Sequence, residues 1–168
     1  TTQLANHKAD FHTITTDLES QYSITMDYSY GYNFHAKYGR QIPIFAQLQN
    51  NGNDFHGWLE VSIPLAPKGN VYRKEIKLPA GENAKISMLI PLVDGYGQID
   101  IKLVDEDYNI VLESTNYIKL GNYEKILYAG VLSESPDELE YLDNLAIKTF
   151  LLNSDTFPEE KGYLDVFD

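Results

Sequence analysis

A mainly β fold followed by the start of an α/β unit is predicted for this chain of 168 residues by three observations. Residues 22–120 contain short segments in which apolar and polar side chains alternate, as in strands with one buried face. Turn-forming residues separate these segments, and no helical period occurs among them. After residue 120, continuous apolar segments flank a helix-start signal, which is typical of a sheet covered on both faces.

Residues 1–21 are polar and show neither a period of two nor one of 3.6, so we expect a flexible leader. Seven strands are then expected, over residues 22–30, 42–48, 55–63, 71–78, 84–92, 99–103 and 110–120. Seven short alternating strands joined by turns are typical of an immunoglobulin-like or fibronectin-like antiparallel sandwich, which we assign to residues 22–120. Pro43 lies inside the second strand and predicts an edge position or a bulge there.

Residues 121–168 are expected to form an incomplete α/β segment. A continuous strand over 126–132 precedes Ser135 and Pro136, which fit the N-cap and first position of a helix. Leucines at successive spacings of three give that helix an apolar stripe: Leu139, Leu142 and Leu145. Further strands are expected over 147–152 and 163–167, completing a β-α-β start. So small a unit cannot bury its own sheet on both faces, so it must pack against the sandwich, a partner or additional sequence.

Charge and composition limit the classes of function. The net charge is −12, and residues 121–168 hold eleven acidic side chains against three basic ones. Such a surface repels phosphate backbones and anionic lipid, so nucleic acid is not an expected partner. Cysteine is absent, which excludes disulfides and thiolate zinc sites within this chain. No apolar run is long enough to span a bilayer, so we expect no membrane insertion by this chain.

Aromatic side chains offer the strongest candidates for ligand recognition. Trp58 falls on the polar face of its strand beside His56, and tyrosines gather in the segment before the second strand. The candidate ligand-binding residues are Trp58, His56, Tyr28, Tyr30, Tyr32 and Tyr38. Exposed rings stack on sugars or anchor proteins. The alternative is that these rings form cross-strand pairs or cover a sheet edge.

Other chemistry has weaker support. Asp105, Asp107 and Asn109 begin like an EF-hand loop, but Ile110 replaces the required glycine, so an acidic hairpin turn is the preferred interpretation. The four histidines lack metal-ligand spacing, and neither a nucleophile elbow nor a Gly-rich phosphate loop is present. We therefore expect no catalytic residue, metal or cofactor.

Several short motifs together resemble a family of secreted, membrane-anchored proteins of Gram-positive bacteria. They are Ala36-Lys37-Tyr38-Gly39-Arg40, Asn50-Asn51-Gly52, Leu78-Pro79-Ala80-Gly81, Gly130-Val131-Leu132-Ser133 and Leu164-Asp165-Val166. The resemblance covers about residues 22–168 and implies an immunoglobulin-like sandwich that continues into a glutamine-amidotransferase-like α/β domain. It implies a cell-surface location with anchoring segments outside this chain, and it transfers no catalytic residue.

The first hypothesis is a non-catalytic, extracytoplasmic sandwich that positions or recognises something for a larger surface protein. A second is an accessory domain of an amidotransferase-like enzyme, which a downstream nucleophile and base would favour. A third is carbohydrate binding, which predicts several rings on one exposed face. The expected partners are cell-wall glycan or another surface protein.

Overall fold

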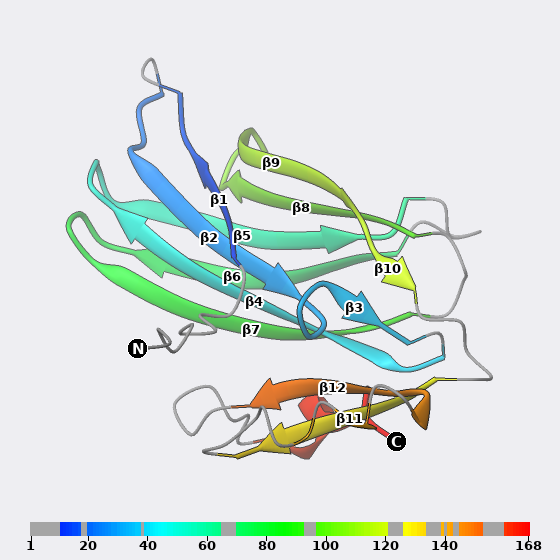
Figure 1. The fold of residues 1–168 in the computed structure, drawn as a ribbon. Helices are drawn as coiled ribbons and strands as arrows, with labels where there is room; N and C mark the ends of the chain where they lie inside the picture. The colour runs from blue at the N-terminus through cyan, green and yellow to red at the C-terminus, as the bar shows by residue number, and fades with distance from the viewer. Residues whose placement is uncertain are drawn as a thin grey trace.

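The computed structural model describes residues 11–17, 20–37, 39–64, 70–92, 97–120, 126–133, 139, 141–142, 145–152 and 160–168. Two four-stranded antiparallel sheets face each other as a β-sandwich (Figure 1). Sheet I has the order β1 (His12–Thr15), β2 (Ile24–Tyr30), β4 (Gln41–Asn50), β7 (Asn83–Pro91). Sheet II has the order β6 (Val71–Leu78), β5 (Phe55–Ser62), β8 (Gln98–Asp105), β9 (Ile110–Tyr117).

The core lies between the two sheets and is built by the alternation seen in the sequence. Even-numbered positions of β2 and β4 and odd-numbered positions of β5 and β8 are buried, which gives one continuous apolar cluster. The seven predicted strands correspond to β2, β4, β5, β6, β7, β8 and β9 within one or two residues at most ends. The mainly β class and the antiparallel pairing are confirmed.

Two local predictions are wrong. Residues 12–15 of the expected flexible leader form β1, because Ile14 packs on the core and Thr13 donates a hydrogen bond to Asp27 across the pair. Pro43 lies in β4, between β2 and β7, rather than on an edge strand. Its missing N–H is tolerated because the β2 ladder ends at Tyr30, and only the Pro43 carbonyl is used there, by the Gly31 N–H.

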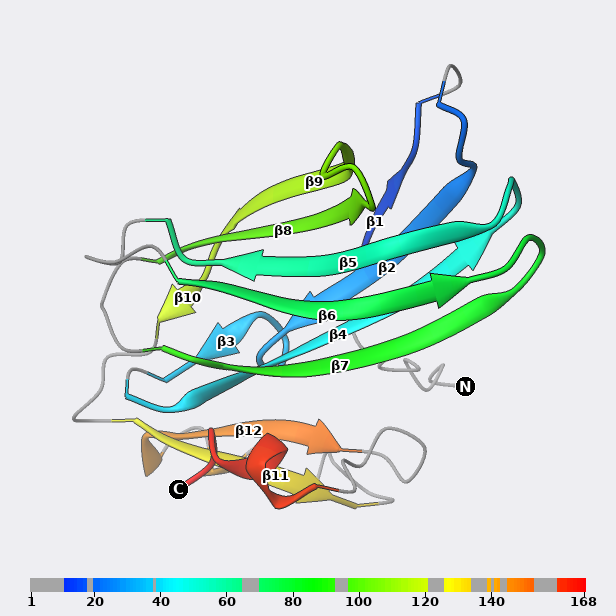
Figure 2. The same cartoon turned by 180° about the vertical axis from the view of Figure 1, so that it is seen from behind.

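A tight turn after β2 leads into β3 (His35–Ala36), which pairs in parallel with β10 (Lys119–Leu120). Because β3 follows β2 and β10 follows β9, this pair connects the two sheets at one end (Figure 2). Gly31 opens the turn with φ +60°, and a Cβ there would lie 1.9 Å from the His35 carbonyl oxygen. Only glycine fits this close approach.

The C-terminal segment forms a small unit with its own core. β11 (Leu127–Leu132) and β12 (Ile147–Leu152) pair in parallel, as the β-α-β interpretation requires. The helix start at Ser135 lies outside the described residues. The leucines of the expected apolar stripe, Leu139, Leu142 and Leu145, have 3₁₀ rather than α-helical conformation, and Leu145 is exposed. The third strand predicted over 163–167 is wrong. Residues Lys161–Leu164 form the 3₁₀ helix η2, because Tyr163 and Val166, three residues apart, are the buried ones.

This small unit lies against the outer face of sheet I (Figure 1). Phe45 of β4 contacts the Tyr163 ring, with centroids 5.7 Å apart, and a Cβ on Gly162 would touch Leu89 of β7. Pro43, at an outward position of β4, is buried. The outward apolar residues of sheet I are therefore covered by the C-terminal segment.

Candidate functional site

The outer face of sheet II carries Trp58, the only tryptophan of the chain. Alternation along β5 turns His56 and Trp58 outward, with ring centroids 6.3 Å apart. Trp58 pairs with Glu75 on β6 and with Val104 on β8. The prediction that Trp58 lies on the polar face of its strand is confirmed, although its ring is half-buried.

Tyr108 in the turn between β8 and β9 covers part of Trp58. The two rings are stacked, with centroids 5.2 Å apart and planes 7° apart, and the Arg73 guanidinium lies 5.2 Å from the Tyr108 centroid. Tyr108 is 59% exposed and has φ +63°, a left-handed conformation that bulky side chains rarely adopt. Such a conformation costs about 1–3 kcal/mol, so other contacts must hold it.

Asp105 holds this turn. Its carboxylate accepts hydrogen bonds from the backbone N–H groups of Asp107 (3.0 Å) and Asn109 (2.8 Å) and from the Asn109 side-chain amide. Because both carboxylate oxygens are used in this way, the EF-hand-like spacing makes a hairpin turn, as preferred from the sequence. The described residues contain no group of three or more histidine or carboxylate side chains arranged for a metal ion.

His56 lies between two carboxylates. Its Nε2 is 2.8 Å from Glu75 Oε1, and its Nδ1 contacts Glu106 Oε1. The hydrogen bond to Glu75 raises the pKa of His56, and the bond to Glu106 adds to it against the opposing effect of desolvation. The same bond lowers the pKa of Glu75, with help from Lys77. This part of the face therefore favours an imidazolium whose two N–H groups both donate.

The next row of the same face is a ladder of alternating charge across all four strands. Arg73 pairs with Glu60, and Lys102 lies 2.6 Å from Glu113. The hydrogen bond to Glu113 raises the pKa of Lys102. These pairs leave the face charged but locally balanced.

The tyrosines of the predicted site do not join Trp58. Tyr28 and Tyr30 are buried, at 1% and 3% exposure, so the prediction that they belong to an exposed aromatic site is wrong. Both sit at inward positions of β2, where Tyr28 Oη lies 2.5 Å from Ser114 Oγ and Tyr30 Oη donates to the Tyr117 carbonyl. Tyr38 lies outside the described residues.

Tyr32 lies instead in the contact between the sandwich and the C-terminal segment. Its ring is 4.5 Å from that of Phe167 and 6.3 Å from that of Phe150, and its hydroxyl donates to the Tyr163 carbonyl at 3.0 Å. Burial raises the pKa of Tyr32 to about 12. On the same side, Lys148 of β12 donates to His35 Nε2 at 2.8 Å.

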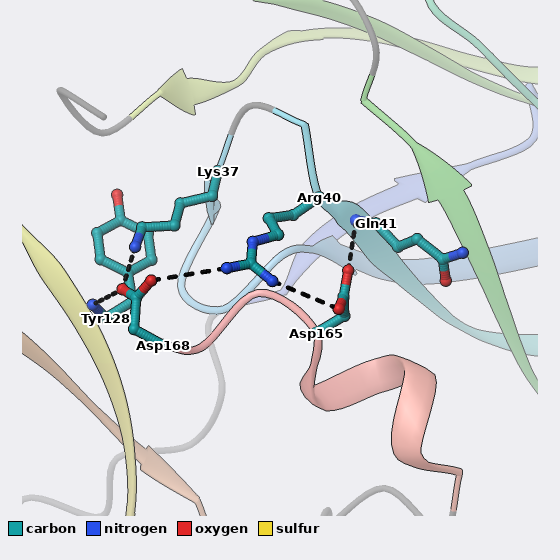
Figure 3. Close-up of polar contacts among 6 residues, drawn as sticks. All are labelled: Lys37, Arg40, Gln41, Tyr128, Asp165 and Asp168. Carbon is teal, nitrogen blue, oxygen red and sulfur yellow. Dashed lines mark hydrogen bonds and ion pairs between the residues drawn. The ribbon is translucent and has the colours of Figure 1, made fainter. Parts of the chain in front are cut away.

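An ion-pair cluster of Lys37, Arg40, Asp165 and Asp168 closes this contact (Figure 3). Lys37 is only 7% exposed, pairs with Asp168 and lies 5.1 Å from the centroid of the Tyr128 ring. Arg40 reaches Asp165 at 3.6 Å and Asp168 at 3.8 Å. The cluster therefore joins the start of β4 to the residues after η2.

Backbone groups complete the cluster. Asp168 accepts a hydrogen bond from the Tyr128 N–H at 2.9 Å, and Asp165 accepts one from the Gln41 N–H at 3.4 Å. Burial alone would raise the pKa of Asp168, but the hydrogen bonds from Lys37 and Tyr128 and the charge of Arg40 hold that pKa below its usual range.

Sequence reasoning missed Tyr108 and Arg73 as neighbours of Trp58, and it missed the ion-pair cluster. One signal was present. Phe45 and Pro43 are apolar at outward positions of β4, which indicates a covered face. Cross-strand pairing of Arg73 with Glu60 required the register of β5 and β6, which alternation does not supply.

A family model described as "Domain of unknown function (DUF8726)" matches residues 23–119, more than half of the chain. The chain belongs to this family. The match begins at β2 and ends at β10, so it covers the sandwich apart from β1. This family assigns no catalytic activity to the chain.

No curated protein matches the chain. Among solved structures, it is similar to a beta-glucosidase from Listeria innocua in complex with glucose, with a TM-score of 0.44 and 11% identity. That likeness covers 62% of this chain and 17% of the beta-glucosidase.

Within the described residues, no helix combines the length and apolar character needed to cross a bilayer.

Proposed function

We propose that this chain is a non-catalytic module that positions the segment following its sandwich within a larger, extracytoplasmic bacterial surface protein. The observation that carries the proposal is the ion-pair cluster, in which Lys37 and Arg40 of the sandwich hold Asp165 and Asp168. Three of these four residues come from two of the motifs on which the family resemblance rests: Lys37 and Arg40 from one, and Asp165 from the other. The resemblance supports the cell-surface location.

The chemistry of the contact suits a positioning role. The rings of Tyr32, Phe150 and Phe167 supply non-directional apolar contact, which tolerates small shifts. Charge-assisted hydrogen bonds are directional, so a buried Lys37 on Asp168 fixes one orientation of the segment. A segment held only by apolar contact could slide on sheet I.

The strand order supports the immunoglobulin-like part of the proposal. Numbering the seven predicted strands in order, the first, second and fifth share sheet I, and the third, sixth and seventh share sheet II, as in immunoglobulin domains. The fourth strand, β6, differs from the constant-type arrangement because it pairs with β5 rather than joining sheet I.

The parallel pair β11–β12 supports the proposed continuation into an α/β domain. Parallel strands are normally covered on both faces, yet Leu127 and Leu132 are 54% and 63% exposed. Further strands and helices would cover them. The alternative, an accessory domain of an amidotransferase-like enzyme, uses the same contact and would be favoured by a nucleophile and base in the continuing domain.

A charge-reversal cycle tests the positioning role. The variants are Lys37→Glu, Asp168→Lys and the double variant, and the readout is hydrogen exchange at the amides of β11 and β12. Each single reversal is expected to speed exchange roughly tenfold or more, and the double variant to recover most of the protection. Lys161→Glu, an exposed lysine of η2, is the matched control for charge. Unchanged exchange in both single variants would refute the proposal.

A further inference from the structure

We propose that Tyr108 and Trp58, with the polar side chains around them, form a binding site for a neutral saccharide on the outer face of sheet II. This site is separate from the ion-pair cluster, which lies on the side of sheet I. It therefore goes beyond the positioning role and stands or falls independently of it.

The first argument is the way in which Tyr108 is presented. An exposed tyrosine with φ +63° is held in one orientation by the stack on Trp58 and by the Asp105 turn. A turn of this shape would be relaxed with glycine or asparagine at that position. A strained position that displays a large aromatic ring indicates a use for the ring.

The second argument is the mixture of donors and acceptors around the ring pair. Arg73 lies over Tyr108, and His56 lies beside Trp58. The side chains of Glu75 and Glu106 are 55% and 65% exposed, so they can accept hydrogen bonds from an incoming ligand. Sugar hydroxyls both donate and accept, while the C–H face of a sugar ring packs on an aromatic ring.

The third argument is charge balance. Three cationic side chains of this face, His56 when protonated, Arg73 and Lys77, are paired with three carboxylates. With His56 protonated these pairs balance one another and offer no excess charge to attract an ion, and the overall charge of −12 disfavours anions. A purely apolar partner would bury these charges at a cost in desolvation. A neutral polyhydroxylated ligand avoids both penalties.

Trp58 is the only tryptophan of the chain, so tryptophan fluorescence reports directly on this site. The full chain is titrated with cellohexaose and with chitohexaose while tryptophan emission is followed, and calorimetry repeats any positive titration. We expect a saturable change with at least one of them at concentrations up to about 10 mM, in the range of weak single-site binding. No saturable change with either saccharide would overturn the proposal.

Tyr108→Gly removes the ring and suits the left-handed backbone, so this variant should fold. It is expected to weaken saccharide binding roughly tenfold or more, and Tyr108→Phe to keep it. Tyr117→Ala removes another exposed tyrosine, on β9, and should bind as the parent does. Equal binding by Tyr108→Gly would overturn the proposal.

One further outcome assigns the face differently. A response to hexalysine without a response to either saccharide would indicate a basic protein partner and overturn saccharide binding. The amide exchange of β11 and β12 does not enter these measurements. Loss of the positioning role and loss of the saccharide site are therefore distinguishable.

Discussion

Phe150→Ala is expected to release the C-terminal segment while leaving the sandwich folded. Phe150 is 1% exposed in the small cluster with Tyr128 and Val166, which is separate from the cluster between the two sheets. Its ring lies 5.0 Å from Tyr128 and 5.9 Å from Phe167. Removing a buried phenylalanine ring costs about 3–5 kcal/mol.

That cost is a large fraction of the free energy of stabilisation that burial of this cluster provides. Full burial of one large apolar side chain contributes about 1.5–3 kcal/mol, so three buried members give roughly 5–9 kcal/mol before any entropy is subtracted. Losing about 3–5 kcal/mol should raise the population of the undocked state by about 150-fold to 5,000-fold. The ion-pair cluster alone cannot offset this.

Hydrogen exchange measured by mass spectrometry provides the assay. Peptides from β11 and β12 should exchange faster by the factor above, whereas peptides from β2, β4 and β5 should keep the parent rates. Leu151→Ala is the matched control, because Leu151 is the next residue of β12 and is 39% exposed. Equal acceleration in both regions would show that the chain unfolds as one unit. Unchanged exchange in β11 and β12 would show that Phe150 does not hold the segment.

Three further predictions concern pH and buried polarity. The fluorescence emission of Trp58 should change with pH, with a midpoint above 6.5. His56 is an imidazolium at lower pH, where its ion pairs form, and these ion pairs are lost as pH rises through the raised pKa of His56. His56→Gln should abolish this transition, and persistence of the transition would contradict the assignment. Docking of the C-terminal segment should survive acid until pH falls through the lowered pKa of Asp168, which NMR signals of β11 amides would follow. An Asp168→Asn variant with the same acid response would contradict it. Asn50→Ala should lower the free energy of unfolding by about 2–4 kcal/mol in urea, since the fully buried amide donates to three backbone carbonyls, and an unchanged midpoint would refute that role.

Alternation predicted the faces of the strands because one face of each sheet is buried and the period of two is strict. The same phase that places Ile24 and Met26 inside also places Tyr28 and Tyr30 inside. The prediction that these two tyrosines are exposed assumed that their hydroxyl groups favour contact with solvent or ligand. Inside the sandwich, however, Ser114 and Asn116 are hydrogen-bond partners of the Tyr28 hydroxyl. Phase was the better guide than residue type.

Contacts between distant segments could not be predicted in this way. Lys37 and Asp168 are 131 residues apart, and no local pattern links a lysine after β3 to an aspartate after η2. The 3₁₀ helix was missed for a related reason. Residues 163–167 are mostly apolar in sequence, but docking on Phe45 selects a spacing of three that buries Tyr163 and Val166.

The outer faces of the two sheets explain why the segment docks where it does. Sheet I turns Pro43, Phe45 and Leu89 outward, and covering them gains apolar burial without breaking an ion pair. Sheet II turns the Arg73–Glu60 and Lys102–Glu113 pairs outward, and covering these would cost desolvation. One face is thereby committed to holding the C-terminal segment, and the other keeps Tyr108 exposed. A ligand bound at Tyr108 would leave the ion-pair cluster in place, so holding and recognition can operate at the same time.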